Sequence, residues 1–161
     1  MKMAATTTER AEIERRFVDE VWNHGDLAVV DEIHAPGGHI HWSPGFANVA
    51  ELKDFVEEVR TGFPDFHMTV EFVLEDDDMV TVGYTASGTN RGPMGGLPPT
   101  GKFVRFGGLW THRYEDDTVV EGWATWDQLG INEQLGLTFP RVLLTLPTML
   151  ARRLVEAIRE R

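Results

Sequence analysis

The stretch His67–Thr89, "HMTVEFVLEDDDMVTVGYTASGT", decides the fold. Its first part alternates apolar and polar residues, which predicts a strand, and "EDDD" predicts a turn before a return strand over Met79–Thr89. The first strand would carry Met68, Val70, Phe72 and Leu74 on one side. Because a two-residue period here follows a helical period upstream, the pattern indicates an α+β fold.

Upstream of this hairpin, apolar residues recur with the period of a helix. The spacing predicts helices over Thr7–Trp22, Leu27–Ile33 and Ala50–Arg60. Asn48 and Glu51 form a capping-box pattern at the start of the third helix. Between the second and third helices, "HIHWS" is expected to be extended.

Downstream of the hairpin, a Gly/Pro-rich loop precedes a second hairpin. We expect strands over Phe103–Tyr114 and Val119–Asp127, joined around "EDDT", so that four strands form one strongly bent antiparallel sheet. Pairing of Glu115 with Thr118 would set the register. One face would then carry Phe106, Gly108, Trp110, His112, Glu121, Trp123, Thr125 and Asp127. A bulge would invert this assignment for part of a strand.

The second strand of that hairpin ends in "EGWATWDQLG", residues 121–130, where an aromatic run meets the carboxylate of Asp127. Partial desolvation would raise the pKa of such a carboxyl group and make it a better base near neutral pH. Aspartate is equally common where it caps a turn by accepting backbone N–H bonds. Residue type alone leaves both interpretations open.

The composition limits the possible partners. The chain has 161 residues, no cysteine and a formal charge of −11, with only three lysines. The absence of a basic footprint argues against a nucleic-acid partner. Neither a signal peptide nor a membrane span is expected, so we expect a cytoplasmic protein without a membrane partner. The acidic, lysine-poor composition would also suit a halophilic cytoplasm, where salt screens the repulsion, although an ordinary acidic protein fits equally well.

The remaining motifs argue against a bound metal or cofactor. His39 and His41 flank one residue and would point the same way in a strand, but no third ligand follows at recognisable spacing, so a contact at a pocket mouth or plain surface is the simpler interpretation. No phosphate-binding loop, dinucleotide fingerprint or serine-nucleophile motif is present. Any reaction is therefore expected to be cofactor-free acid/base chemistry.

The tail from Pro140 differs from the body of the chain. It is apolar, contains Pro147 and ends as a basic amphipathic helix with Leu150, Leu154 and Ile158 on one face. We expect this helix to pack on its own domain or on a second subunit, with membrane-surface binding as the alternative. The expected organisation is a domain over residues 1–137 and a helical extension over 138–161.

Several motifs together resemble one family. They are "VWNHGDLAVVDEI", "GFPDFHMTVEFVLEDDDMVTVGYTASGTNRG" and "GLPPTGKFVRFGGLWTHRYEDDTVVEGWATWD" followed by "QLG". In this order they resemble the SnoaL-like polyketide cyclases, also called ester cyclases, of the nuclear transport factor 2-like superfamily. The resemblance covers roughly residues 9 to 137.

The resemblance implies a cone-shaped fold in which a curved antiparallel sheet and three helices enclose an apolar pocket. It implies a homodimer, a small hydrophobic ligand, and cofactor-free ring closure or isomerisation in which Asp127, at the matching position, is the acid/base residue. Our own strand parity adds the substrate-binding candidates His112, Trp110, Trp123, Trp42, Phe46 and Phe106.

Two other functional classes stay open. An epoxide hydrolase or dehydratase on the same fold would need two carboxylates bridged by an arginine, for which Arg91 and Arg105 are candidates. A non-catalytic ligand-binding or dimerisation module would need no catalytic acid. The acidic residues that line the pocket would discriminate among the three, because a single buried acid favours the cyclase type.

Overall fold

The computed structural model describes residues 8–42, 45–138 and 147 and confirms the α+β fold. The helical elements are α1 (Glu9–Arg16), the π-helix η1 (Phe17–Asn23), α2 (Ala28–Ile33), α3 (Val49–Gly62) and α4 (Gln128–Leu135). The strands are β1 (His34–His41), β2 (His67–Asp76), β3 (Met79–Thr89), β4 (Phe103–Glu115) and β5 (Thr118–Trp126). The helix expected in the C-terminal tail lies outside the described residues.

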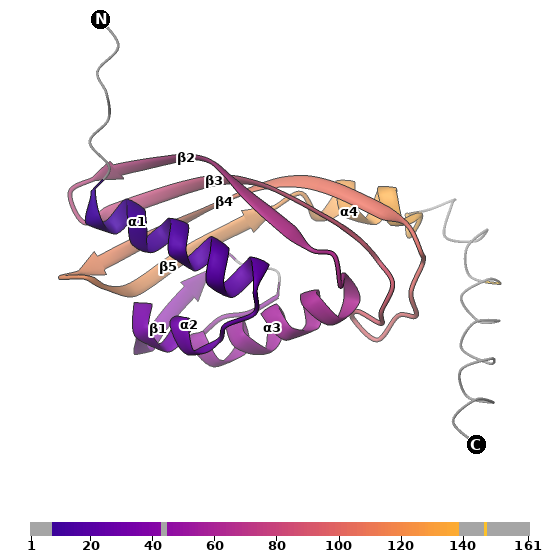
Figure 1. Cartoon of the computed structure of the whole chain (residues 1–161), viewed down its shortest axis with the longest axis horizontal. Helices are drawn as coiled ribbons and strands as arrows, with labels where there is room; N and C mark the ends of the chain where they lie inside the picture. The colour runs from indigo at the N-terminus through magenta and orange to yellow at the C-terminus, as the bar shows by residue number, and fades with distance from the viewer. Residues whose placement is uncertain (1–7, 43–44, 139–146, 148–161) are drawn as a thin grey trace, which may run out of the picture.

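The five strands form one curved sheet in the order β1-β5-β4-β3-β2 (Figure 1). The four long strands form the predicted antiparallel meander. Residues 39–41 of the segment expected to be extended belong to β1, which begins already at His34, pairs with β5 in parallel and makes the sheet mixed. A parallel neighbour needs a long crossover connection, and here α3 and the other strands intervene between β1 and β5.

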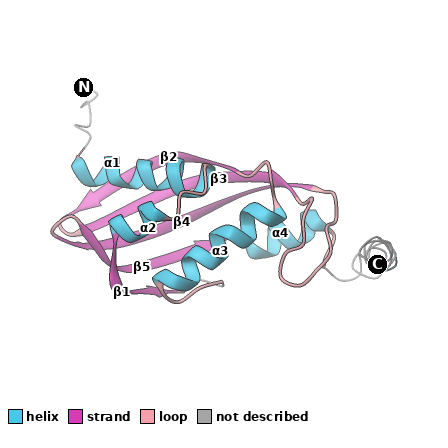
Figure 2. Cartoon of the chain, turned by 60° about the horizontal axis from the view of Figure 1, so that its bottom comes forward, coloured by secondary structure: helices cyan, strands magenta, loops and turns pink. Residues whose placement is uncertain are grey.

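Helices α1, α2 and α3 lie along one face of the sheet (Figure 2). The predicted cap is present at the start of α3, where the Asn48 side chain accepts a hydrogen bond from Glu51 N, and Thr8 caps α1 by accepting one from Ala11 N. The apolar residues of α3 and of the inner sheet face bury one another and form a single core.

A bulge in β5 corrects the predicted register of the second hairpin. Glu115 pairs with Thr118 as expected, but the register shifts after Tyr114, and Arg113 then pairs with Glu121. Every later residue of β5 is therefore displaced by one position and moves to the opposite face. Ala124 now pairs with Trp110 on the inner face, and Trp126 with Gly108, whereas Trp123 and Glu121 belong to the outer face.

A second bulge corrects the face assignment in β2. The register shifts between Val70 and Phe72, so that Phe72 pairs with Gly83 and Leu74 with Thr81. Both side chains therefore leave the inner face and are exposed on the outer one. The alternation in the sequence predicted the strand correctly, but it placed all four apolar side chains on one face. In the structure the bulge divides them between the two faces.

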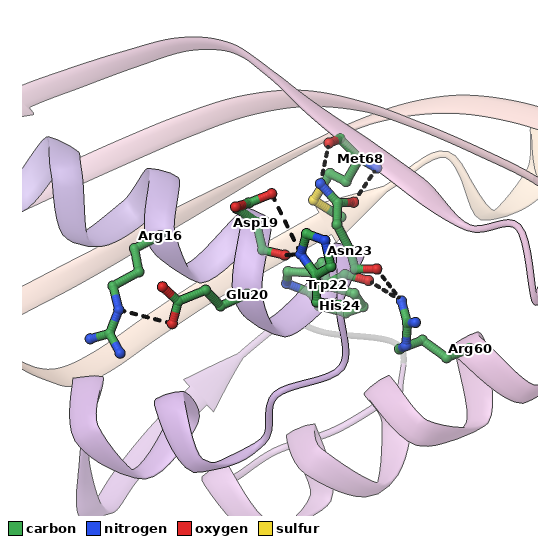
Figure 3. Close-up of polar contacts among 8 residues, drawn as sticks. All are labelled: Arg16, Asp19, Glu20, Trp22, Asn23, His24, Arg60 and Met68. Carbon is green, nitrogen blue, oxygen red and sulfur yellow. Dashed lines mark hydrogen bonds and ion pairs between the residues drawn. The ribbon is translucent and has the colours of Figure 1, made fainter.

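The end of η1 is attached to both the sheet and α3 (Figure 3). The Asn23 side chain accepts a hydrogen bond from Met68 N at 2.8 Å and donates one to Met68 O at 3.1 Å. Arg60 donates to the carbonyl oxygens of Trp22 and Asn23. Carbonyl groups at the end of a helix lack intrahelical donors, so this arginine satisfies them from α3.

We expect Asn23→Ala to lower the free energy of unfolding by about 1–3 kcal/mol, because it leaves the partly buried N–H and C=O of Met68 without partners. Urea unfolding measures the change. Asn132→Ala is the control, since its side chain makes one exposed contact, with Gln128; its effect should stay within about 0.5 kcal/mol. Equal losses in the two variants would contradict the proposed role of Asn23.

Candidate functional site

A cavity of about 370 Å³ lies among η1, α3, α4 and the inner face of the sheet. Its wall is mainly aromatic and aliphatic. Aromatic residues from every side line it: Phe17, Trp22, Phe46, Phe55, Phe66, Tyr84, Phe106, Trp110 and Trp126. An apolar cavity with few polar groups is the usual form of a small-molecule site.

One wall of this cavity is backed by a buried carboxylate. Glu14 of α1 is only 1% exposed and accepts hydrogen bonds from Trp110 Nε1 at 2.8 Å, from His112 Nδ1 at 2.8 Å and from the Tyr114 hydroxyl at 2.7 Å. The three donors alternate along β4, so they share its inner face. A buried carboxylate requires such partners.

These contacts outweigh the effect of burial on Glu14. Burial alone would raise the pKa of its carboxyl group. The charge and hydrogen bond of His112, with the hydrogen bonds from Tyr114 and Trp110, instead hold that pKa below its usual value. Glu14 is therefore an ionised acceptor at neutral pH.

His112 connects this carboxylate to the cavity. Because Glu14 only accepts, His112 carries its hydrogen on Nδ1, which leaves Nε2 to take or give a proton. Nε2 has no hydrogen-bond partner among the described residues, yet this nitrogen is not fully buried. The imidazole ring lies over Gly122, where a Cβ atom would come within 3.1 Å of Cδ2. This arrangement is suited to acid/base chemistry at Nε2.

A second buried histidine flanks His112. The ring of His34 lies 5.2 Å from that of His112, and its Nδ1 is 3.1 Å from the carbonyl oxygen of Val30. Burial, followed by the charge of His112, lowers the pKa of His34 to about 3. His34 is therefore neutral, with a buried Nε2 that has no partner among the described residues.

Four of the sequence-predicted pocket residues surround the cavity through their side chains. His112, Trp110 and Phe106 come from the inner face of β4, and the ring of Phe46 stacks against Trp126. Trp126 joins them in the cavity wall because the bulge in β5 turns it to the inner face.

The other two aromatic candidates have a different setting. Trp123 is among the residues around the cavity, but its ring stacks on His41 at 5.3 Å, on the outer face. Trp42 is 82% exposed, and its ring lies 6.5 Å from that of Trp123. Trp42 does not line the cavity.

Asp127 lies where α4 begins. Its side chain accepts a hydrogen bond from Gly130 N at 2.8 Å and caps the helix. The residue is exposed and is absent from the cavity wall; it borders a shallow hollow on the outer face of the sheet. This geometry agrees with the interpretation that Asp127 caps a turn by accepting a backbone N–H bond.

Sequence reasoning missed Glu14, although a signal was present. Glu14 is three residues before Phe17 and seven before Val21, so it falls on the apolar stripe of the first helix. A carboxylate on such a stripe needs a buried partner, and "WTHRY" in β4 supplies three donors at alternate positions. The pairing spans about a hundred residues, so only the fold brings the groups together.

The other charged cluster lies outside the cavity. Arg113 forms ion pairs with Glu121 at 2.8 Å and Glu115 at 3.3 Å, and Glu121 also meets His41 Nε2 at 2.7 Å. The rings of His39 and His41 are 4.3 Å apart. Within residues 8–42 and 45–138, no group of three or more His, Asp or Glu side chains could hold a metal ion. The same part of the chain contains no helix long and apolar enough to cross a bilayer.

The comparisons with known proteins agree with this fold. The model of the SnoaL-like polyketide cyclase family matches residues 12–135. Among curated proteins, none is similar enough in sequence to count as a match.

Solved structures resemble the chain over most of its length. A protein of Jannaschia sp. CCS1, provisionally described as a SnoaL-like polyketide cyclase, is 25% identical with a TM-score of 0.71, over 84% of this chain and 96% of that one. AclR of Streptomyces galilaeus, provisionally a hydroxylase, is 25% identical (TM-score 0.72; 83% and 99% covered). IdmH of Streptomyces antibioticus, provisionally a polyketide cyclase, is 27% identical (TM-score 0.69; 80% and 99% covered).

The buried His34 should make the fold sensitive to acid. Its pKa is about 3 when folded and near 6.5 when unfolded, so between these values the unfolded chain binds the extra proton and stability falls as the pH is lowered. Between pH 7 and pH 5, we expect the free energy of unfolding to fall by about 2 kcal/mol less in His34→Phe than in the parent. Urea unfolding at the two pH values tests this. Parallel losses in the two proteins would contradict the buried, neutral state of His34.

Proposed function

Because the chain belongs to the SnoaL-like polyketide cyclase family, we propose that it is an enzyme that performs cofactor-free acid/base chemistry on an apolar small molecule. The reaction class is ring closure by aldol addition, or isomerisation through the same enolate. The observation that carries this proposal is the pair formed by Glu14 and His112 at the wall of the apolar cavity.

The acids of the described residues favour this class over the two alternatives. Glu14 is the one buried carboxylate among them. A hydrolase with two carboxylates and an arginine around a water would need that cluster inside the cavity, but Glu115, Arg113 and Glu121 cluster outside it. A purely structural or binding module would need no imidazole poised by a buried carboxylate.

In the proposed step, His112 Nε2 takes a proton from a carbon next to a carbonyl group of the ligand. The C–H electron pair moves into the carbonyl group and forms an enolate. For ring closure, the enolate carbon attacks a second carbonyl carbon, a C–C bond forms, and the resulting alkoxide receives the proton from His112. Glu14 is a positioning residue, since it holds the imidazole and stabilises its charged form.

We assign the acid/base role to His112 and a capping role to Asp127. The resemblance implied Asp127 as the acid/base residue. The hydrogen bond from Gly130 N to Asp127 and the exposed position of that carboxylate support the assignment to His112 instead.

A two-ring ketone tests this proposal without knowledge of the natural substrate. We expect the protein to accelerate hydrogen–deuterium exchange at the benzylic α-carbon of 2-tetralone in D₂O, followed by NMR. His112→Asn should reduce the exchange rate by about 100-fold or more, because an amide cannot take the proton. Asp127→Asn should retain the rate, because its amide oxygen can still cap α4.

Two outcomes would contradict the assignment. Loss of exchange in Asp127→Asn with an unchanged melting temperature would return the acid/base role to Asp127. Equal exchange in the parent and in His112→Asn would remove His112 from the chemistry. Thermal unfolding of each variant separates loss of a base from loss of the fold.

We also propose that the protein is a homodimer in an intracellular, high-salt setting. The outer sheet face exposes Phe72 (43%) and Leu109 (44%) beside a shallow hollow above Gly83 and Gly107. Apolar surface of this kind requires cover.

Light scattering at micromolar concentration tests the dimer. We expect a dimer whose association strengthens with salt, because each chain carries a formal charge of −11 and salt screens the repulsion between copies. Leu109→Asp places a charge on the apolar face and should yield monomers. A parent protein that is monomeric in both dilute buffer and molar potassium chloride would contradict the proposal.

A further inference from the structure

Tyr84 provides a polar group in the cavity that the proposed reaction does not use. It lies on the inner face of β3, is only 8% exposed, and lines the cavity. Its hydroxyl has no hydrogen-bond partner among the described residues, although the oxygen is not fully buried. A buried hydroxyl normally has a partner, so this one requires an explanation.

The position of Tyr84 depends on a glycine of the neighbouring strand. Tyr84 pairs with Gly108, and its hydroxyl and terminal ring carbon occupy the space that a side chain at residue 108 would fill. The phenol therefore reaches from β3 over Gly108 of β4. None of the described residues forms a hydrogen bond with its hydroxyl, which leaves that group available to a ligand.

Tyr84 and His112 lie on either side of Trp110. The Trp110 ring centroid is 5.0 Å from that of Tyr84 and 6.1 Å from that of His112. Pairing along the hairpin gives the same order, with Gly108, Trp110 and His112 opposite Tyr84, Val82 and Val80. A ligand that reaches both polar groups must therefore extend across the indole ring of Trp110.

We propose that the Tyr84 hydroxyl donates a hydrogen bond to a carbonyl oxygen of the ligand, on the far side of Trp110 from His112. This inference rests on the proposed function, since it concerns the ligand of the same cavity. It assigns one polar contact: the residue that donates and the place of the oxygen that accepts.

The properties of Tyr84 suit a donor. Burial raises the pKa of its hydroxyl group, so the phenol stays protonated in the working pH range. The indole N–H of Trp22 is also without a partner among the described residues, and Trp22 lines the same cavity, but that nitrogen is fully buried. Of these two unpaired donors, Tyr84 is therefore the one that a ligand can reach.

The test is binding of two matched naphthalenes, followed by isothermal titration calorimetry. 2-Acetylnaphthalene carries the carbonyl oxygen, and 2-isopropenylnaphthalene has the same shape with a CH₂ group in place of that oxygen. Tyr84→Phe removes only the hydroxyl. We expect this variant to bind the ketone about 5-fold more weakly than the parent does and the hydrocarbon equally well, because one neutral hydrogen bond is lost.

The melting temperature of Tyr84→Phe should match that of the parent, because the hydroxyl has no partner among the described residues. An equal change in the affinity of both naphthalenes, or no change in either, would overturn the role of Tyr84. Failure of the parent to bind the ketone would overturn it as well. Weaker binding of the ketone alone in Tyr84→Phe, without exchange of 2-tetralone by the parent, would instead count against the proposed chemistry and leave the Tyr84 contact standing.

Discussion

The buried carboxylate of Glu14 is the interaction on which the arrangement of this protein depends. It is removed from water and would be costly without partners, and β4 supplies three donors at alternate positions. The Arg10 side chain covers one of these donors, Tyr114: its guanidinium carbon lies 5.3 Å from the centre of the Tyr114 ring. The network therefore fixes the first helix against the middle of the sheet and orients an imidazole at the cavity wall.

The irregular parts of the sheet give the molecule two different faces. The bulge in β5 turns Trp126 and Ala124 inward and Trp123 and Glu121 outward. The bulge in β2 sends Phe72 to the outer face. The charged groups are therefore separated: Arg113 and Glu121 form their ion pair outside the cavity. Among the described residues, His112 is the one histidine that lines the cavity and is supported by the buried Glu14, whereas the lining acid Glu58 is exposed.

Much of the fold was predictable because it depends on local pattern. The three N-terminal helices and the four long strands followed from periodicity, and the cap at Asn48 followed from residue type, whereas α4 was not predicted. The register of the second hairpin did not follow, because one extra residue near Val120 inverts the remainder of β5. Nothing in the alternation of that segment marks where the extra residue falls.

The sequence by itself determined the α+β class, the order of the three N-terminal helices and four long strands, and a face of β4 that carries Trp110 and His112, since these depend on composition and short-range period. Only the tertiary structure decided which polar groups meet. Glu14 and His112 are 98 residues apart and are joined by a hydrogen bond of 2.8 Å, and Asp127, at the end of an aromatic strand, points to the start of α4. The reason is physical: a buried charge finds its partners across the core, and sequence spacing does not record distances between strands and helices.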